Sequence, residues 1–412
     1  MTQLETLIQT LCPNGVKFVK LGEVVKSIHS GLNPRDNFRL NEEGATGYYV
    51  TVKEITSGKI EFTDKTDRIT EEARTIIQNR SHLEVNDVLL SGIGTIGKVA
   101  LVDIPVNNWN CSESVLLLKP NQEYLIPKFL VYILQSKEIQ TIFNRDSVGS
   151  TLKGIRKKSL ESLQIPLPPL AVQSEIVRLL DKFTLYKSEL AAELAARLQQ
   201  YEYYRDQLFT FGDDVERKTL GEIGTFTRGR RFCRTDIVDE GQSCIHYGDI
   251  YTYYGLNTTT TKTHLPYDFP VKLRYAEKGD VVIVGAGEND IDIGVGVVWE
   301  GNDSVAVHDA CYIFKHNMNP RYISHYLRTI NYHLQIKKYV NRGKICSISA
   351  EGIAKAVIPI PSLAEQERIA SILDRFDALC HDIREGLPAE IDLRQKQYEH
   401  YRDKLLTFEA KG

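Results

Sequence analysis

Apolar positions near the start of the chain change from helical to strand spacing at a single turn. Four of them share one face at helical spacing and stop before Pro13-Asn14-Gly15, which predicts a short helix: Leu4, Leu7, Ile8 and Leu11. From Val16 to about Leu163, short β-branched runs such as VVKSI, YYVTV and SVLLLK are separated by Gly, Asn, Asp and Pro. This pattern predicts a β-rich globular domain.

A helical stretch within that domain begins at Pro127, where a missing backbone N–H costs nothing, and continues through KFLVYILQSKEIQTIF. The region from Val215 to about Val357 repeats the same order. LGEV of the first region corresponds to LGEI of the second, and NDVLL corresponds to GDVVI. Pro320 begins a second helical run, as Pro127 begins the first. The residues between these elements differ. Two related domains with unlike loops predict two different targets.

One pair of motifs occurs twice with little change. IPLPPLAVQSEIVRLLDKF (165–183) returns 193 residues later as IPIPSLAEQERIASILDRF (358–376), and QYEYYRDQLFTF (200–211) returns as QYEHYRDKLLTF (397–408). Such a long period indicates an internal duplication.

Each repeat continues into a long helical segment with apolar steps of three and four residues, which predicts a coiled-coil seam. A helix from Ala171 to Phe209 would be about 58 Å long, although an ordinary amphipathic core helix is the alternative. In the second copy, Gly386-Leu387-Pro388 predicts that the helix stops and restarts. We therefore expect one helix in the first copy and two in the second.

These elements predict an α+β chain in which two β-rich target-recognition domains alternate with two long antiparallel coiled-coil regions about a pseudo-two-fold axis. The predicted segments are 1–163, 164–212, 213–357 and 358–412. Two unlike modules on a helical spacer suit two patches of duplex DNA more than one turn apart.

Composition adds little to this picture. The 412 residues carry a net charge of −3, so any nucleic-acid binding must come from local basic clusters. Seven scattered cysteines without zinc-site spacing indicate free thiols in a reducing compartment. We expect a cytoplasmic protein, because neither a signal peptide nor a membrane-spanning run is evident.

Basic residues beside glycine recur at similar places in both halves. TRGRRFCR (227–234) follows a predicted strand, and STLKGIRKKS (150–159) and NRGKIC (341–346) occupy equivalent places. Arginine suits guanine edges and phosphates, although a solvated turn is the alternative for the arginine loop. The candidate DNA contacts from these segments are Lys153, Arg156, Lys157, Arg228, Arg230, Arg231, Arg234, Arg342 and Lys344.

GIGTIGK (92–98) matches the glycine fingerprint of dinucleotide sites, but short β-branched residues follow it where a helix is required. We predict a β-hairpin loop in which Thr95 and Lys98 approach DNA, with Asn289 in the second-half counterpart VGAGEND (284–290). Motifs for ATP binding, zinc proteases and serine hydrolases are missing, and no catalytic or metal-binding residues are predicted.

The two repeats, with SELAAELAAR (188–197) before the second motif, resemble the conserved regions of the specificity subunit of type I restriction–modification systems. The resemblance covers the whole chain in order and is strong only in the helical regions. SELA-AELA (188–195) is similar to the four-residue repeats whose copy number in some family members sets the spacer between half-sites.

The resemblance implies a non-catalytic subunit that reads a bipartite, asymmetric double-stranded DNA target, with one half-site for each domain. It implies two methyltransferase subunits as partners and, through them, restriction subunits; S-adenosylmethionine, ATP and Mg would be held by those partners, and no membrane is involved. A coiled-coil scaffold joining two protein-binding domains without DNA is the alternative. The residues expected at the helical and subunit interfaces are Leu170, Gln173, Ile176, Leu180, Phe183, Leu194, Tyr201, Leu363, Gln366, Ile369, Leu373, Phe376, Ile391 and Tyr398.

Overall fold

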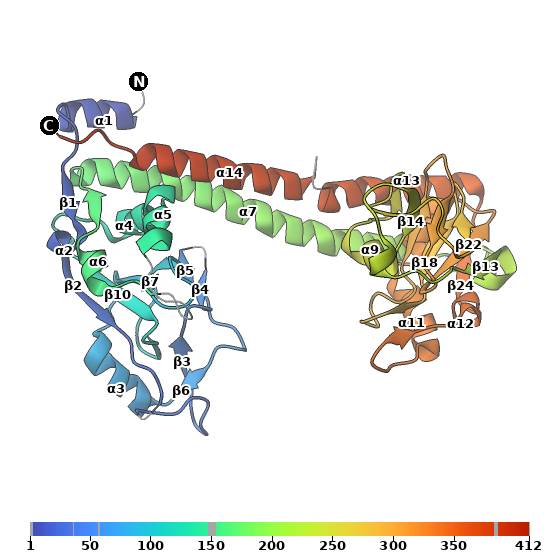
Figure 1. Ribbon diagram of the computed structural model, residues 1–412, viewed down its shortest axis with the longest axis horizontal. Helices are drawn as coiled ribbons and strands as arrows, with labels where there is room; N and C mark the ends of the chain where they lie inside the picture. The colour runs from blue at the N-terminus through green and yellow to red at the C-terminus, as the bar shows by residue number, and fades with distance from the viewer. Residues whose placement is uncertain (1–2, 36, 57, 147–153, 383–385, 412) are drawn as a thin grey trace. The chain divides into compact units, whose positions relative to one another are not determined.

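The computed structural model describes residues 3–35, 37–56, 58–146, 154–382 and 386–411 (Figure 1). Contacts divide the chain into two compact units, one formed by residues 1–189 with 392–412 and the other by residues 190–391. The division falls within α7 (Leu170–Leu208) and within α14 (Leu387–Leu406). The four-segment division predicted above, with boundaries after residues 163, 212 and 357, stays a prediction.

The first unit contains an antiparallel sheet in the order β2-β10-β7-β8, beside a smaller sheet in the order β6-β3-β9. Both share an interior of aliphatic residues and Trp109, which is fully buried. The strands are β2 (Val25–Ser30), β3 (Gly47–Val50), β4 (Ile55–Thr56), β5 (Lys59–Ile60), β6 (Arg68–Ile69), β7 (Val88–Ser91), β8 (Val99–Leu101), β9 (Trp109–Cys111) and β10 (Val115–Pro120).

Helices of this unit correct two expectations. α3 (Glu71–Ser81) lies inside the region predicted to be mainly strands, and the predicted helix after Pro127 is two helices separated at Ser136, whose extended backbone ends α4. The predicted leading helix is confirmed as α1. The helices before α7 are α1 (Gln3–Leu11), α2 (Leu21–Val24), α3, α4 (Pro127–Gln135), α5 (Lys137–Asp146) and α6 (Lys157–Glu161).

The second unit repeats the main sheet in the order β13-β22-β18-β20-β15, and a smaller sheet follows the order β16-β14-β21-β17. The strands are β13 (Gly224–Arg228), β14 (Gln242–Ile245), β15 (Asn257–Thr258), β16 (Thr263–Leu265), β17 (Tyr275–Ala276), β18 (Val281–Val284), β19 (Ala286–Gly287), β20 (Gly296–Trp299), β21 (Val305–Val307), β22 (Cys311–His316) and β23 (Cys346–Ser347). The helices are α8 (Leu220–Ile223), α9 (Tyr247–Thr252), α10 (Pro320–Tyr326), α11 (Ile330–Ile336) and α12 (Ala350–Ala354), with 3₁₀ turns η1 (Arg234–Asp236) and η2 (Lys337–Tyr339). The single helical run expected after Pro320 is therefore also interrupted, by a turn at residues 327–329.

The proline-rich segments before the long helices form one short strand pair in each unit. β1 (Phe18–Lys20) pairs with β11 (Gln164–Pro166), and β12 (Arg217–Thr219) pairs with β24 (Val357–Pro359), both antiparallel. Pro166 and Pro359 occupy equivalent positions in the two pairs. Each long helix therefore starts from a strand that is paired with an earlier strand of the same unit.

α7 is one helix, whereas its repeat is divided into α13 (Leu363–His381) and α14, as predicted from Gly386-Leu387-Pro388. In the first unit, Phe183 stacks on Tyr401 at 5.3 Å between ring centroids, and Lys187 donates to Gln395 at 2.7 Å. In the second unit, Tyr204 and Tyr201 of α7 lie 5.9 Å from Phe376 and 5.8 Å from His381, respectively. Rising residue numbers in α7 meet falling numbers in α14 and in α13, so the predicted antiparallel pairing is confirmed within each unit.

A buried glutamine attaches each sheet to its long helix in the same way. The Gln173 carboxamide accepts from the Ile126 N–H at 2.9 Å and donates to the carbonyls of Tyr124 and Pro168 at 2.8 Å. Its repeat, Gln366, accepts from the Asn319 N–H at 3.0 Å and donates to Pro361 at 2.8 Å. Ile126 and Asn319 directly precede the prolines that begin α4 and α10, so each glutamine fixes the start of a helix.

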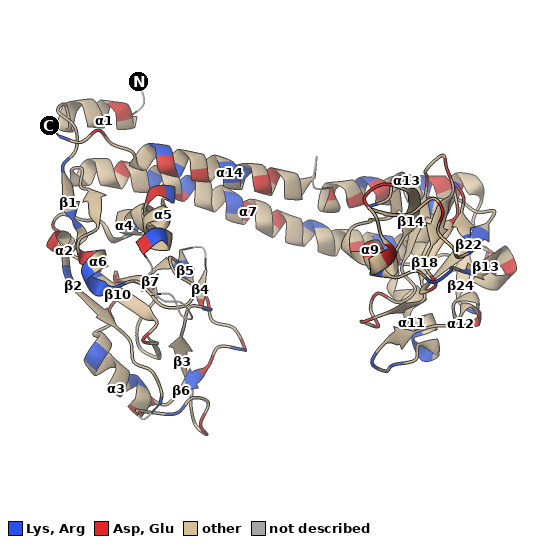
Figure 2. Ribbon diagram, in the orientation of Figure 1, with Lys and Arg blue, Asp and Glu red and all other residues tan. Residues whose placement is uncertain are grey.

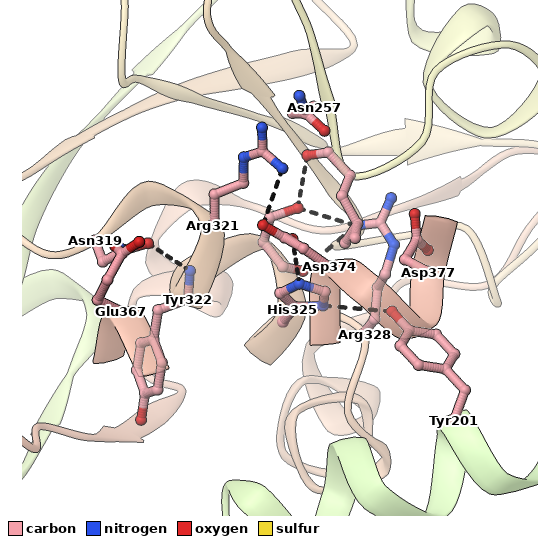
Figure 3. A network of polar contacts seen from close by, with 12 residues as sticks. Tyr201, Asn257, Asn319, Arg321, Tyr322, His325, Arg328, Glu367, Asp374 and Asp377 are labelled. Carbon is pink, nitrogen blue, oxygen red and sulfur yellow. Dashed lines mark hydrogen bonds and ion pairs between the residues drawn. The ribbon is translucent and has the colours of Figure 1, made fainter. Parts of the chain in front are cut away.

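A second matched attachment centres on one aspartate of each long helix. Lys128 and Tyr132 of α4 both contact Asp181, with the Lys128 ammonium 3.0 Å from the carboxylate. In the second unit, Arg321 and His325 of α10 converge on Asp374 (Figure 3). The Arg321 guanidinium and Nε2 of His325 lie 3.0 and 2.9 Å from the two carboxylate oxygens of Asp374. Arg321 also forms a two-pronged pair with Glu300 at 2.7 and 2.9 Å.

The far ends of the long helices supply a third matched contact. The Asp403 carboxylate accepts from the Lys137 N–H at 3.1 Å, and Asp206 accepts from the Ile330 N–H at 2.8 Å. Each carboxylate thus meets the first N–H of α5 or α11, where the partial positive charge of a helix favours an anion. Both units are held on their helix pair by the same three kinds of contact.

Figure 2 shows Lys and Arg interspersed with Asp and Glu along α7 and α14. None of the helices within the described ranges is long and apolar enough to span a bilayer.

Candidate nucleic-acid interface

The segments predicted to contact DNA follow strands that end at one edge of each main sheet. In the second unit Arg228 pairs with Tyr312 and Val284 with Cys311, so the end of β13, the end of β18 and the start of β22 coincide. In the first unit Ser30 pairs with Leu116 and Ser91 with Val115. We call the segments beyond this edge the rim: residues 31–35, 92–98 and 112–114 in the first unit, and 229–234, 285–295 and 308–310 in the second.

Matched backbone hydrogen bonds join two of the rim segments in each unit and attach a further segment to them. The Gly92 N–H donates to Ser114 and the Ile155 N–H donates to Gly92, both at 2.8 Å; the Gly285 N–H donates to Ala310 and the Ile348 N–H to Gly285, also at 2.8 Å. The predicted basic segments that include Arg156 and Lys344 are therefore tied to the two rims close to these bonds.

A glycine begins the first segment of each rim because the neighbouring strand leaves no space for a side chain. A Cβ on Gly31 would lie 1.8 Å from the Cys111 carbonyl oxygen, and one on Gly229 would lie 2.2 Å from that of His308. Separations this short exclude any other residue unless the backbone moves. The chain is thereby held close to β9 and β21 just before the rim residues that differ between the two units.

The arginine loop presents its cations to solvent. Arg228, Arg230, Arg231 and Arg234 are all exposed. Arg228 donates through Nε to the Asp309 carbonyl at 2.7 Å and lies 3.8 Å from the Asp309 carboxylate. Across the described ranges, Arg230, Arg231 and Arg234 pair with no carboxylate. Three guanidinium groups therefore stay available to a ligand.

The two glycine-rich loops lie between antiparallel strands. Residues 92–98 connect β7 to β8, so the hairpin interpretation is confirmed and the dinucleotide fingerprint is accidental. Thr95 is exposed at its tip, whereas the Lys98 ammonium donates to the Val52 carbonyl at 2.9 Å and is held within the unit. In the second unit, Asn289 is exposed and its amide lies 3.4 Å from Asp292.

The other predicted basic residues are also at the surface where the structure describes them. Arg156, Lys157 and Lys344 are exposed, and Lys157 lies 3.9 Å from Glu161. Arg342 is paired with Asp290 of the glycine-rich loop at 3.0 Å, so two rim segments are joined by charge. Lys153 lies outside the described residues. As DNA contacts, these positions stay predictions.

The residues predicted for the helical interfaces divide by burial. Seven are buried within their own unit: Gln173, Ile176, Leu180, Tyr201, Gln366, Ile369 and Leu373. Phe183, Leu194, Phe376, Ile391 and Tyr398 are partly buried. Leu170 and Leu363 are 40% and 63% exposed, so these two equivalent leucines present apolar surface at the start of each long helix.

Two features of the rims escaped the sequence analysis. In the first unit the Asn33 amide donates to the Glu113 carboxylate at 2.6 Å. In the second, the rings of His246 and His308 lie 4.6 Å apart behind the arginine loop, and burial lowers the pKa of His246 to about 4. Aligning the two halves on Gly31 and Gly229 would have directed attention to Asn33. Within the described ranges, no three His, Cys, Asp or Glu side chains gather closely enough to hold a metal ion.

Comparison with known proteins gives the two halves one description. The family model for the type I restriction modification DNA specificity domain matches residues 13–200 and again residues 212–393. The specificity subunit of the EcoR124I/EcoR124II enzyme of Escherichia coli is 34% identical over 274 residues, covering 62% of this chain and 65% of that protein. A putative specificity subunit of Haemophilus influenzae is 34% identical over 271 residues, covering 63% and 68%.

Solved structures share the fold over nearly the whole chain. A chain from a structural study of assembly and conformational transition in a type I R-M system aligns with a TM-score of 0.65 at 18% identity, covering 96% of this chain and 98% of the other. The HsdS subunit of Thermoanaerobacter tengcongensis aligns with a TM-score of 0.50 at 17% identity, covering 96% of each. Two family matches, each spanning a rim and the long helix that carries it, place this chain in the family of type I restriction-modification DNA specificity subunits.

Proposed function

We propose that this chain is the DNA-recognition subunit of a type I restriction–modification enzyme and reads a bipartite, asymmetric duplex target. The observation that carries the proposal is the pair of rims, which share one backbone arrangement but present different side chains. A repeated scaffold with unlike loops suits two half-sites of different sequence. Each rim would read one half-site.

Methyltransferase and restriction activities would reside on partner subunits. Two methyltransferase subunits would dock on the helical regions, where Leu170 and Leu363 offer equivalent exposed apolar side chains, and restriction subunits would join through them. S-adenosylmethionine, ATP and Mg would be held by those partners. The chain itself would contribute sequence choice and no catalytic group.

A scaffold that joins two protein-binding domains is less well supported than DNA recognition. The guanidinium groups of Arg230 and Arg231 are exposed beside a glycine that fixes the local backbone. Arginine in such a setting matches the acceptor pair of guanine or a phosphate. A protein-binding surface of ordinary composition has no need of this cluster.

Binding of the chain, assembled with its methyltransferase subunit, to cognate duplex DNA tests the proposal. We expect the logarithm of the binding constant to fall linearly with the logarithm of salt concentration. Changing Arg230→Ala and Arg231→Ala together should weaken binding roughly ten- to hundredfold and slow methylation of the cognate site.

Lys278→Ala is the matched control, because this exposed cation lies at the opposite end of β18 from the rim and should leave binding unchanged. An assembled complex that binds no duplex at low salt would refute the proposed function. Unchanged methylation by the double arginine variant would remove the arginine loop from the interface.

A further inference from the structure

The two rims place different side chains at one matched position. The Leu32 N–H donates to the Cys111 carbonyl at 3.3 Å, and the Arg230 N–H donates to the Val307 carbonyl at 2.9 Å. Cys111 and Val307 are the last residues of β9 and β21, the equivalent parallel-paired strands of the smaller sheets. The residue that follows each donor is therefore equivalent: Asn33 in the first unit and Arg231 in the second.

Asn33 is held by contacts on both sides of it. The Tyr49 hydroxyl donates to the Leu32 carbonyl at 2.8 Å, and the Asn33 carbonyl accepts from the Asn37 amide at 3.1 Å. Burial raises the pKa of Tyr49 far above its ordinary value, so this hydroxyl keeps the proton that it donates. The side chain of Asn33 is partly exposed on a backbone that cannot easily rotate.

Glu113 determines which way the Asn33 amide faces. Its carboxylate lies 2.6 Å from Nδ2 of Asn33, and a carboxylate oxygen accepts but does not donate. One N–H of the amide is thereby used, while the second N–H and Oδ1 have no partner among the residues that the structure describes. That donor and acceptor pair matches N7 and N6–H of adenine in the major groove.

The second rim differs in chemistry at the same place. Asp309 corresponds to Glu113, because the Ser112 N–H and the His308 N–H make equivalent bonds to the last residues of β3 and β14. Asp309 lies near Arg228 and 3.4 Å from His308, and Arg231 is left exposed. A free guanidinium matches the N7 and O6 acceptor pair of guanine.

We propose that Asn33, oriented by Glu113, reads an adenine in the half-site of the first unit, and that Arg231 reads a guanine in the half-site of the second. The inference rests on the proposed function and assigns one base-reading residue to each rim. Asn33 and Arg231 touch base edges, whereas Glu113 acts as a positioning residue for the amide.

Methylation-site mapping of the assembled complex on a duplex library with both half-sites randomised tests the assignment. Asn33→Ala should reduce preference for one adenine of the first half-site roughly ten- to hundredfold and leave the second half-site unchanged. Arg231→Ala should do the reverse, at a guanine. Asn107→Ala, an exposed amide at the opposite end of β9, should alter neither half-site.

Glu113→Gln separates positioning from mere structural support. A glutamine can donate to Oδ1 of Asn33, so the amide can turn over and discrimination at that same adenine should relax while total methylation stays within about threefold. A purely structural role would instead lower methylation of every site together.

The outcomes distinguish the two levels of proposal. A wild-type complex with no bipartite site would refute the proposed function. A wild-type complex with a bipartite site that Asn33→Ala leaves unchanged would overturn the inference alone. If Asn33→Ala fails to assemble, Asn33→Gln, which keeps the amide and shifts it by one methylene, must change preference at the same position or the inference falls.

Discussion

The first unit attaches α4 to its long helix through Lys128 and Tyr132, whereas the second uses Arg321 and His325 at the matched positions. Both pairs meet an aspartate that is identical in the two repeats, Asp181 or Asp374. The buried glutamines and the helix-capping aspartates are also identical. The two repeats share the glutamines and aspartates whose loss would leave buried hydrogen-bonding groups without partners. The partner residues differ only where another donor reaches the same carboxylate.

The rims differ far more than the attachments. Gly31 and Gly229 are the same because no side chain fits, yet Asn33 and Arg231 follow at matched positions. Steric limits therefore preserve the backbone of each rim, and exposure leaves its chemistry free to diverge. A duplicated chain can read two unlike sequences without altering how either unit is held.

The largest expected difference between the units is their response to acid. Burial lowers the pKa of five histidines in the second unit: His246 and His316, each to about 4, and His308, His325 and His333. In the first unit, burial lowers the pKa of one described histidine, His29. A lowered folded-state pKa means that stability is present above pH 6.5 and is lost as pH falls toward 4.

His246 and His316 should each reduce the free energy of unfolding by no more than about 1.4 kcal/mol per pH unit in that window. His381 opposes them, because its hydrogen bond to Asp377 raises its pKa. Hydrogen exchange at pH 7 and pH 5, resolved by segment, should show greater loss of protection in residues 190–391. His316→Asn can keep an acceptor for the Met318 N–H. This variant should take up close to one proton fewer on unfolding at low pH, so its stability should depend less steeply on pH. Equal loss in both units would contradict the comparison.

The buried glutamines should give the next largest effects. Gln173→Ala leaves one N–H and two carbonyls without partners, and Gln366→Ala leaves one of each. We expect losses of about 3 and about 2 kcal/mol in the free energy of unfolding, measured by urea denaturation. Gln199→Ala, an exposed amide on α7, should cost at most about 0.5 kcal/mol. A smaller loss for Gln173→Ala than for Gln366→Ala would contradict the view that the cost follows the number of backbone groups left without partners.

The attachments and the rims also differ in how far the sequence reveals them. The repeated helices, the interruption at Gly386-Leu387-Pro388 and the hairpin at residues 92–98 follow from local patterns of apolar residues, glycine and proline. α3 does not, because only Ala73, Ile77 and Ser81 of that helix are buried and one of these is polar.

Long-range pairs are harder still to predict. Asn33 and Glu113 are separated by 80 residues, and Lys137 and Asp403 by 266. Their meeting depends on how strands and helices assemble, and no local period encodes it. The repeat does reveal the two aspartates, since Asp206 and Asp403 occupy the same position in the aligned motifs. It does not reveal which backbone N–H groups these carboxylates contact.

The smallest expected difference concerns the cations that contact Asp181 and Asp374. It measures how much more stability arginine provides in the second unit than lysine provides in the first. Arg321→Ala removes a two-pronged pair with Glu300 as well as the contact with Asp374, whereas Lys128→Ala removes one contact of a side chain that is 43% exposed. We expect losses of about 2 kcal/mol for Arg321→Ala and at most about 1 kcal/mol for Lys128→Ala in the free energy of unfolding. Arg321→Lys should fall between them, because an ammonium group cannot span both carboxylates in the planar geometry that a guanidinium provides.

Urea denaturation in low salt and in 1 M salt makes the comparison sharper. In 1 M salt, screening should abolish the contribution of the exposed Lys128–Asp181 pair to the free energy of unfolding. The more enclosed Arg321 network should keep most of its contribution. If the two alanine variants were equally costly at both salt concentrations, the second carboxylate, Glu300, would add nothing to the attachment of α10.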